Sequence, residues 1–204
     1  MARWEPDARG RLERAALELF DECGFEETTV EEIAARAGLT KRTFFRYFAD
    51  KREVLFGTGP EFQNLFVDGL RAAPESATGL DAVAHSLGAA AADFPAPREF
   101  ARRRHKVIAA NDSLRERELV KLASVASALA GALRERGVEE PEASVLAETA
   151  IAVFRVAFER WVAEDSGRGL DVHVREALEA LTTVVGSTAP ARTGTGGMQD
   201  RERG

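Results

Sequence analysis

The chain contains very little cysteine and histidine. Cys23 is the single cysteine among 204 residues, and the three histidines are His85, His105 and His173. A lone cysteine forms no internal disulfide, and these four residues are too scattered for a recognisable zinc-binding pattern. We therefore expect no metal site. Because Cys23 falls on the apolar face of a helical pattern, we expect it to be a core residue.

Long apolar runs are also missing. No stretch approaches the roughly 18 consecutive apolar residues that a membrane-spanning helix needs, and the N-terminal sequence MARWEPDARGRLERA lacks the apolar stretch of a signal peptide. Apolar residues make up 45% and charged residues 30%, which is the composition of an ordinary globular protein. These features predict a cytoplasmic protein with no membrane partner.

Catalytic motifs are the third absence. The sequence shows no nucleophile with a base and an orienting acid, no metal-ligand cluster and no phosphate-binding loop. Its serines fall mostly in helix caps and helix interiors. We therefore expect no catalytic residues, no cofactor and no enzyme activity.

One short segment is basic although the chain as a whole is acidic. The formal net charge is −6. From Arg36 to Arg52, six Lys and Arg side chains stand against one aspartate, which gives +6 − 1 = +5 and leaves −11 for the remainder. A basic island of this kind is typical of proteins that bind a polyanion, since neutralised phosphates release their counterions. The alternative is a basic helix face that is simply solvated.

Helical periodicity dominates the chain, and the alternation typical of strands is nearly absent. Apolar spacing, capping residues and glycine or proline stops predict an all-α protein of about nine helices. We expect an N-terminal domain over residues 9–69, a helical C-terminal domain over 70–186 and a disordered, glycine-rich tail over 187–204. The sequence GTGP, residues 57–60, predicts a break in the fourth helix, because proline is not tolerated inside a helix.

Two short helices around a glycine have the spacing of a helix-turn-helix motif. The first is predicted in TTVEEIAARAG, and the second, KRTFFRY, follows Gly38. On a helical wheel Phe44 and Phe48 face inward, so that the basic residues of the second helix point outward. In this motif the second helix lies in the major groove of DNA.

The segment Val145–Val162 is apolar around most of its circumference. A helix of this kind is buried on two sides. In a chain of this length we interpret one of those sides as the contact with a second copy of the protein.

Residues 15–55, AALELFDECGFEETTVEEIAARAGLTKRTFFRYFADKREVL, resemble the N-terminal domain of the TetR family of bacterial repressors. The Leu-Phe and Gly-Phe pairs, the Thr-Thr-Val, the Ile-Ala, the Ala-Gly and the Phe-x-Tyr-Phe all fall in the family register. The resemblance implies an all-helical homodimer with a three-helix head that binds double-stranded operator DNA. It also implies a larger helical body that binds a small molecule and dimerises through its last two long helices.

The resemblance further implies which residues meet DNA. Thr29 falls where the second helix meets a phosphate, and Lys51 falls at the start of a fourth helix that clamps the backbone. The family commonly has tyrosine where this chain has Phe45, which would pack against sugar or a thymine methyl. The predicted DNA-binding residues, with Arg36 from the basic segment, are Thr29, Arg36, Lys41, Arg42, Thr43, Phe45, Arg46, Tyr47 and Lys51.

The C-terminal part more loosely resembles a branch of this family whose bodies are described as acyl-CoA-like ligand-binding domains, as in mycofactocin-associated regulators. The resemblance lies in RTFFRYF, FGTGPEF and PREFARRRHKVIAANDSLRERE. It implies an effector that is acyl-CoA-like or otherwise hydrophobic. We expect a mostly apolar cavity wall, formed by Phe62, Phe66, His85, Phe94, Phe154, Phe158 and Trp161.

The run RRRHK, Arg102 to Lys106, has two interpretations. Arg102 and Arg103 could form a cationic mouth for the phosphates of CoA. Alternatively, the run could be a solvated face that pairs with Glu99, Glu116 or Glu118.

The sequence thus predicts a ligand-responsive transcriptional regulator. We expect a repressor that binds a palindromic operator as a homodimer and is released by a small hydrophobic or acyl-CoA-like effector. The alternative is a ligand-independent architectural DNA-binding protein with a filled helical body.

Overall fold

The computed structural model describes residues 7–57 and 59–187. All regular secondary structure in these residues is helical, which confirms the all-α prediction. The elements are α1 (Ala8–Cys23), α2 (Val30–Arg36), α3 (Lys41–Tyr47), the 3-10 turn η1 (Arg52–Leu55), α4 (Gly59–Arg71), α5 (Gly79–Ala92), α6 (Arg98–Ala109), α7 (Asp112–Glu135), α8 (Glu142–Ala163) and α9 (Leu170–Ser187). Ser187 ends α9, and the rest of the tail predicted to be disordered, 188–204, lies outside the described residues. In the described ranges, no helix has the length and apolar character needed to cross a membrane.

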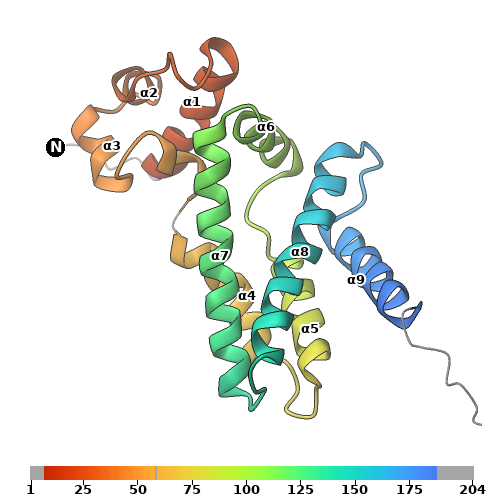
Figure 1. Ribbon diagram of the computed structural model, residues 1–204. Coiled ribbons are helices and arrows are strands. Elements are labelled where there is room, and N and C mark those ends of the chain that lie inside the picture. Colours follow the sequence, from red (N-terminus) through yellow and green to blue (C-terminus); the bar gives the residue numbers. More distant parts are fainter. Residues whose placement is uncertain (1–6, 58, 188–204) are drawn as a thin grey trace, which may run out of the picture.

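The helices form a small head and a longer body (Figure 1). The head holds α1, α2, α3 and η1, and α7 runs from the head along the length of the body. In the body α4 packs against α5 and α7, and α8 packs against α7 and α9.

The head is held by aromatic and aliphatic side chains from all three of its helices. Phe44 and Phe48, predicted to face inward, are 0% and 3% exposed, which confirms that prediction. Cys23, expected in the core, is exposed. The reason is that α1 ends at Cys23 and the chain turns at Gly24, so that Phe25 packs against Phe20 in its place, with ring centroids 5.2 Å apart.

The fourth helix begins later than expected. The Asp50 carboxylate accepts hydrogen bonds from the backbone N–H groups of Arg52 (2.8 Å) and Glu53 (3.1 Å), and these bonds start only the short turn η1. Gly57 then adopts a left-handed conformation with φ 62°, which a glycine reaches without steric cost. α4 begins at Gly59, so the predicted break is confirmed, but Lys51 precedes a 3-10 turn and not an α-helix.

The buried apolar residues form two clusters. The head cluster runs from Leu12 to Phe56 and also takes in Val107, Ile108 and Leu114 from the corner between α6 and α7. The body cluster begins at Phe66, since the apolar face of α4 meets α5 and α7. The chain passes from the head cluster to the body cluster between Phe56 and Phe66, and the head rests on the α6–α7 corner.

α8 buries most of its apolar surface within its own chain. Ten of its residues are buried against α5, α6, α7 and α9. Val145 and Val156 remain 61% and 50% exposed on its outer face. The all-round apolar pattern therefore mainly reflects packing inside one chain, and a narrower apolar face is left at the surface.

Candidate nucleic-acid interface and internal cavity

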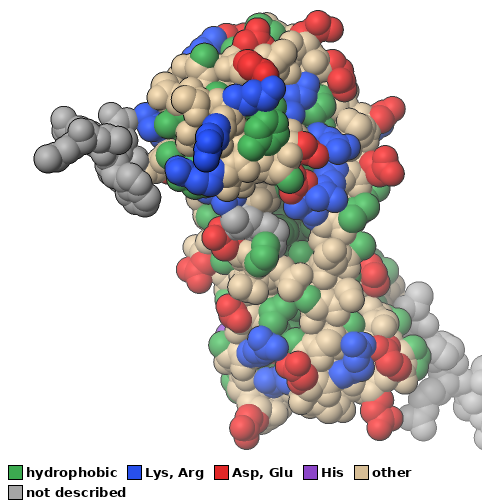
Figure 2. Space-filling model, turned by 90° about the vertical axis from the view of Figure 1, so that its left-hand side faces the viewer, with side chains coloured by type: hydrophobic (Ala, Val, Ile, Leu, Met, Phe, Trp, Pro, Cys, Tyr) green, Lys and Arg blue, Asp and Glu red, His purple; other side chains and the backbone are tan. Residues whose placement is uncertain are grey.

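α3 presents a compact outward face at the end of the molecule. The Thr40 hydroxyl caps the helix by accepting a hydrogen bond from the backbone N–H of Thr43 at 3.2 Å. Because Phe44 is buried on the inner side, Arg42, Phe45 and Arg46 are held on the exposed side. Figure 2 shows Lys and Arg side chains gathered over this part of the head.

Much of the basic segment is neutralised within the head. The Arg36 guanidinium lies 2.8 Å from Glu22 and 3.5 Å from Glu18, both on α1. The hydrogen bond between Arg36 and Glu22 raises the pKa of Arg36 and lowers that of the Glu22 carboxyl. Arg36 therefore ties α2 to α1, and its predicted contact with DNA would compete with two carboxylates.

Lys41 and Arg52 are also paired with carboxylates. Lys41 forms an ion pair with Glu31 of α2, and this hydrogen bond lowers the pKa of the Glu31 carboxyl. The Arg52 guanidinium lies 2.9 Å from Asp50. The sequence count of +5 thus overstates the charge that this surface offers to a polyanion.

Two arginines of α3 keep their charge at the surface. Arg42 is exposed and has no hydrogen bond or ion pair with any residue that the structure describes. The Arg46 guanidinium lies 4.9 Å from the ring centroid of Tyr47 and donates to its hydroxyl at 3.1 Å. Phe45 is 48% exposed beside them. These groups can supply hydrogen-bond donors and an apolar contact to base edges.

Thr29 acts as the N-cap of α2. Its hydroxyl accepts from the backbone N–H of Glu32 at 3.2 Å, and the Glu32 carboxylate accepts from the backbone N–H of Thr29 at 2.8 Å. This capping box leaves Thr29 exposed at the positive end of the α2 dipole. A phosphate oxygen would be stabilised at such a helix terminus.

Lys51 is half-buried, and its side chain bonds to the backbone of the loop between α1 and α2. Its ammonium donates to the backbone carbonyls of Phe25 (2.5 Å), Glu26 (3.1 Å) and Thr28 (2.9 Å). An ammonium has three N–H donors, and here all three are used. Lys51 therefore holds the loop between α1 and α2, and the DNA contact implied by the family pattern would compete with these three carbonyls.

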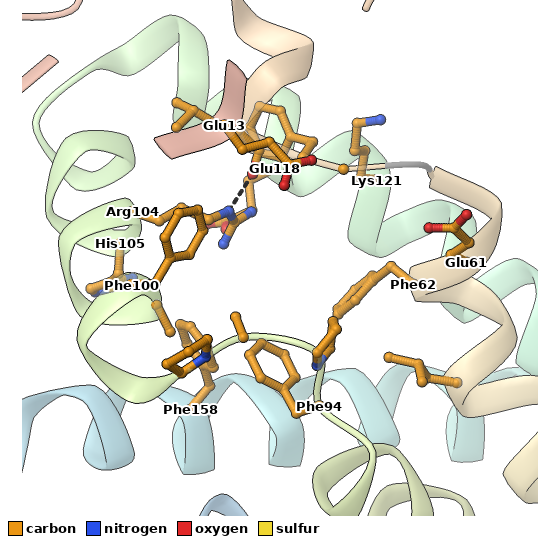
Figure 3. A pocket seen from close by; sticks show the side chains of 18 of the residues that line it. Glu13, Glu61, Phe62, Phe94, Phe100, Arg104, His105, Glu118, Lys121 and Phe158 are labelled. Atoms are coloured by element: carbon orange, nitrogen blue, oxygen red, sulfur yellow. Dashed lines mark hydrogen bonds and ion pairs between the residues drawn. The ribbon is translucent and has the colours of Figure 1, made fainter. Parts of the chain in front are cut away.

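A cavity of about 600 Å³ lies between the head and the body. Figure 2 shows the surface hollowed between these two parts. On the body side its wall is aromatic, and Figure 3 shows Phe62, Phe94, Phe100 and Phe158 around it. On the head side it is lined by α1 residues such as Glu13 and by Leu55 and Phe56 at the end of η1.

Family profiles match two separate segments of the chain. Residues 13–57 match the bacterial regulatory proteins of the tetR family, and residues 77–186, more than half of the chain, match the MftR C-terminal domain. The chain belongs to the TetR family.

A curated HTH-type regulator matches part of the chain. The chain is 40% identical over 81 residues to the HTH-type transcriptional regulator TcmR of Streptomyces glaucescens. The matched segment is 40% of this chain and 36% of TcmR, so it spans about a third of that relative.

Solved TetR-type structures have the same fold at low identity. The Thermus thermophilus FadR, a TetR-family transcriptional repressor in complex with lauroyl-CoA, matches with a TM-score of 0.56 at 24% identity, over 93% of this chain and 100% of that chain. The Bacillus subtilis FadR in complex with stearoyl-CoA matches with a TM-score of 0.58 at 21% identity, over 84% of this chain and 96% of that chain. These likenesses show the shared fold.

Four of the predicted ligand-binding residues of this TetR-family body line the cavity. They are Phe62, Phe94, Phe154 and Phe158. Phe66 and Trp161 lie behind this wall: Phe66 is fully buried against Phe154, with ring centroids 5.0 Å apart, and Trp161 packs on Phe94 at 5.7 Å. Helical spacing does not distinguish an aromatic residue that faces a cavity from one that packs behind it.

Three polar residues predicted for the ligand site lie elsewhere. His85 is exposed, and its Nδ1 lies 2.9 Å from the carbonyl oxygen of Gly69. Arg102 donates from Nε to the carbonyl of Val162 at 2.7 Å, near the C-terminal end of α8. Arg103 forms an ion pair with Asp21 of α1 at 2.6 Å. Arg102 and Arg103 therefore hold helices together, and neither of the two interpretations of their run describes them.

The sequence interpretation missed the polar groups that do line the cavity. Arg104 and His105 belong to the same run and face the cavity from α6, and Glu118 and Lys121 face it from α7. Arg104 pairs with Glu118 at 3.5 Å, as the second interpretation of the run expected for one of its members. The spacing of residues on α6 could have indicated this. Residues 101, 104, 105 and 108 share one side of a helix, so Arg104 and His105 face the same way as the buried residues Ala101 and Ile108.

Proposed function

We propose that this protein is a ligand-responsive transcriptional repressor that acts in the cytoplasm. It binds a palindromic operator as a homodimer and is released by a small hydrophobic or acyl-CoA-like effector. The observation that supports this proposal is the cavity between head and body, because a molecule that fills it touches both the DNA-binding head and the helices that carry it.

The outward face of α3 is proposed to read the operator. Arg42, Phe45, Arg46, Tyr47 and Thr43 lie on or beside that face, and Arg42 and Arg46 carry charge without a carboxylate partner in the described chain. Thr29 would place one phosphate at the start of α2. Arg36 and Lys41 would contribute mainly through the local potential, because each is already paired.

A homodimer is proposed through the outer faces of α8 and α9. Val145 and Val156 on α8 and Val184 and Val185 on α9 are each at least 50% exposed. Large exposed apolar side chains on neighbouring helices favour contact with another protein surface. Two heads held by such a contact would have to reach major grooves one helical turn apart, about 34 Å in B-DNA.

The effector is proposed to act by binding linkage. The FadR proteins of the same fold are described in complex with lauroyl-CoA and stearoyl-CoA, and the aromatic body side of this cavity would suit an acyl chain. A ligand that favours a head position unsuited to DNA lowers operator affinity by the same coupling free energy, typically about 1–3 kcal/mol. The unfilled cavity favours this function over the architectural alternative.

The test begins with operator selection from a random-sequence library by the purified full-length protein. Fluorescence anisotropy with the selected duplex then follows its release by lauroyl-CoA, stearoyl-CoA, free CoA and a panel of hydrophobic drugs. We expect at least one hydrophobic compound to lower operator affinity about fivefold or more.

A matched pair of variants tests whether the ligand acts through the cavity. Leu65→Trp narrows the cavity and should weaken the response at unchanged operator affinity, while Leu119→Trp, on the exposed side of α7, should respond normally. Failure of every compound to shift operator binding would support the architectural alternative.

A further inference from the structure

The guanidinium of Arg104 lines the cavity and contacts both the head and the body. Arg104 projects from α6, and its Nε donates to the backbone carbonyl of Leu55, at the end of η1. Its guanidinium carbon lies 5.3 Å from the ring centroid of Phe56, and the group lies 3.5 Å from the Glu118 carboxylate. Arg104 therefore links the last turn of the head to two helices of the body.

Arg104 is only partly satisfied by these partners. A guanidinium has five N–H donors, and within the described chain Arg104 uses one in a hydrogen bond to Leu55 and makes one long ion pair with Glu118. Burial lowers the pKa of Arg104, as is typical of a cation that lacks a close counter-charge. Lys121, by contrast, lies 2.9 Å from Glu53.

The charges near Arg104 leave one cation in excess. Arg9 pairs with Glu13 at 2.9 Å, and Glu53 is shared by Arg117 and Lys121 at 2.7 and 2.9 Å. With Arg104 and Glu118, the local count is four cations against three carboxylates, 4 − 3 = +1. The four cations are Arg9, Arg104, Arg117 and Lys121, and the three carboxylates are Glu13, Glu53 and Glu118.

Over the complete lining the charges balance, because five Lys or Arg stand against five Asp or Glu. The extra cation in the smaller group arises where Arg117 and Lys121 share Glu53, and Arg104 and Glu118 stand as a one-to-one pair. Burial raises the pKa of Glu13, which reduces the repulsion that this carboxyl would exert on an incoming anion near its pKa.

The wall opposite Arg104 is apolar. Figure 3 shows Phe62, Phe94 and Phe158 across the cavity from Arg104 and Glu118. A molecule that fits both sides has an apolar body and one anionic group. We propose that Arg104 binds the anionic group of an amphiphilic effector, and that the effector and the DNA-binding head compete for this guanidinium. This inference rests on the proposed function, because it names the chemistry of the same cavity.

The competition follows from the position of Leu55. Leu55 and Phe56 belong to the head cluster, so the bond from Arg104 holds that cluster against α6. An anion with good geometry binds a guanidinium more strongly than a neutral carbonyl does, and it draws Arg104 toward the cavity. The ion pair between Arg103 and Asp21 at 2.6 Å remains, so that the head loosens without separating from the body.

The first experiment compares three probes that share a ten-carbon chain: decanoate, 1-decanol and decyltrimethylammonium. Calorimetry with the full-length protein should show decanoate binding about tenfold or more tighter than the other two, as one charge-assisted bond predicts. In hydrogen exchange, decanoate should speed exchange in η1 and in the facing part of α1, and 1-decanol should not.

Three variants then assign the effect to Arg104. R104Q should lose the preference for decanoate and keep its affinity for 1-decanol, and without ligand it should already show fast exchange in η1. R104K keeps the charge and should retain part of the preference, which supplies a second test if R104Q folds poorly. R103Q is the matched control: it removes a head–body ion pair outside the cavity and should keep the full preference for decanoate.

The outcomes separate this inference from the proposed function. If decanoate and 1-decanol release the selected operator equally well, the protein is ligand-responsive and the role of Arg104 is refuted. An R104Q variant that still prefers decanoate refutes it as well. If no amphiphile of any charge changes operator binding while another compound of the panel does, the inference fails and the proposed function stands. If no compound at all changes it, both fail.

Discussion

The ammonium of Lys51 lies 4.3 Å from the ring centroid of Phe25, in the loop between α1 and α2. Together with three hydrogen bonds to backbone carbonyls, this contact fixes the loop from which α2 starts. The lysine to which the family pattern assigns a DNA contact thus also holds the loop that precedes α2.

Replacing Lys51 should destabilise the head. Lys51→Met removes charge-assisted bonds to three carbonyls, and we expect a loss of about 2 kcal/mol in the free energy of unfolding. Urea unfolding followed by circular dichroism measures this change. Lys106→Met, at an exposed lysine on α6, is the control and should change stability little. Equal stability of the two variants would show that Lys51 is dispensable for the fold.

Replacing Arg42 should weaken operator binding without affecting the fold. Arg42 has no partner in the described chain, so Arg42→Ala removes only what it contributes to DNA, about 1–3 kcal/mol if it reads a base. Fluorescence anisotropy on the selected operator measures the loss. Arg175→Ala, which removes an arginine from α9 with a 65% exposed side chain, serves as the charge-matched control. Unchanged affinity for Arg42→Ala would remove it from the interface.

A charge on the outer face of α8 should weaken the dimer. Val156→Asp buries a carboxylate in the proposed contact, and we expect at least about a tenfold loss in dimerisation, about 1.4 kcal/mol. Sedimentation velocity over a concentration series gives the constant. Val120→Asp on α7 is a close control, because Val120 and Val156 are 52% and 50% exposed. Monomers formed equally by both variants, or by neither, would place the contact elsewhere.

The contacts that Glu164 makes between the ends of α8 and α9 should contribute less to the free energy of unfolding in acid. Hydrogen bonds from Arg168, Ser166 and His173 lower the pKa of Glu164 from 4.5 to about 2. Since the folded state keeps this carboxylate ionised where the unfolded state protonates it, its contribution is present above about pH 4.5 and is lost as the pH falls toward 2.

Glu164→Gln tests this pH dependence. The variant should be less stable than the parent at pH 7, and its stability should fall less steeply below pH 4.5. Urea unfolding at several pH values measures both slopes, with Glu148→Gln on the exposed side of α8 as the control. Parallel pH profiles for parent and Glu164→Gln would contradict the assigned role.

Local patterns predicted the helical elements well. The turn at Gly38 and the inward phase of Phe44 and Phe48 follow from rules that act within one or two helical turns. The break near Gly57 likewise follows from glycine and proline chemistry. The start of α4 was misjudged, because a cap at Asp50 is compatible with either a 3-10 turn or an α-helix.

The partners of charged side chains could not be predicted in this way. Arg36 meets Glu22 across 14 positions of sequence, and Arg104 meets the Leu55 carbonyl across 49. In each pair the two residues lie on different elements, so helical spacing carries no information about the contact. Such pairs depend on how separate helices are docked, and the basic segment therefore looked more accessible in the sequence than it is in the folded head.

The sequence by itself determined the all-helical fold, the outward face of α3 and the family, because periodicity, caps and short motifs are local properties. Only the tertiary structure decided that Lys51 donates to the loop before α2, that α8 buries most of its apolar surface within one chain and that the cavity lies under the head. Those features arise where α1, η1, α6 and α7 meet. The packing of buried apolar clusters that brings them together is not encoded in the spacing of any one helix.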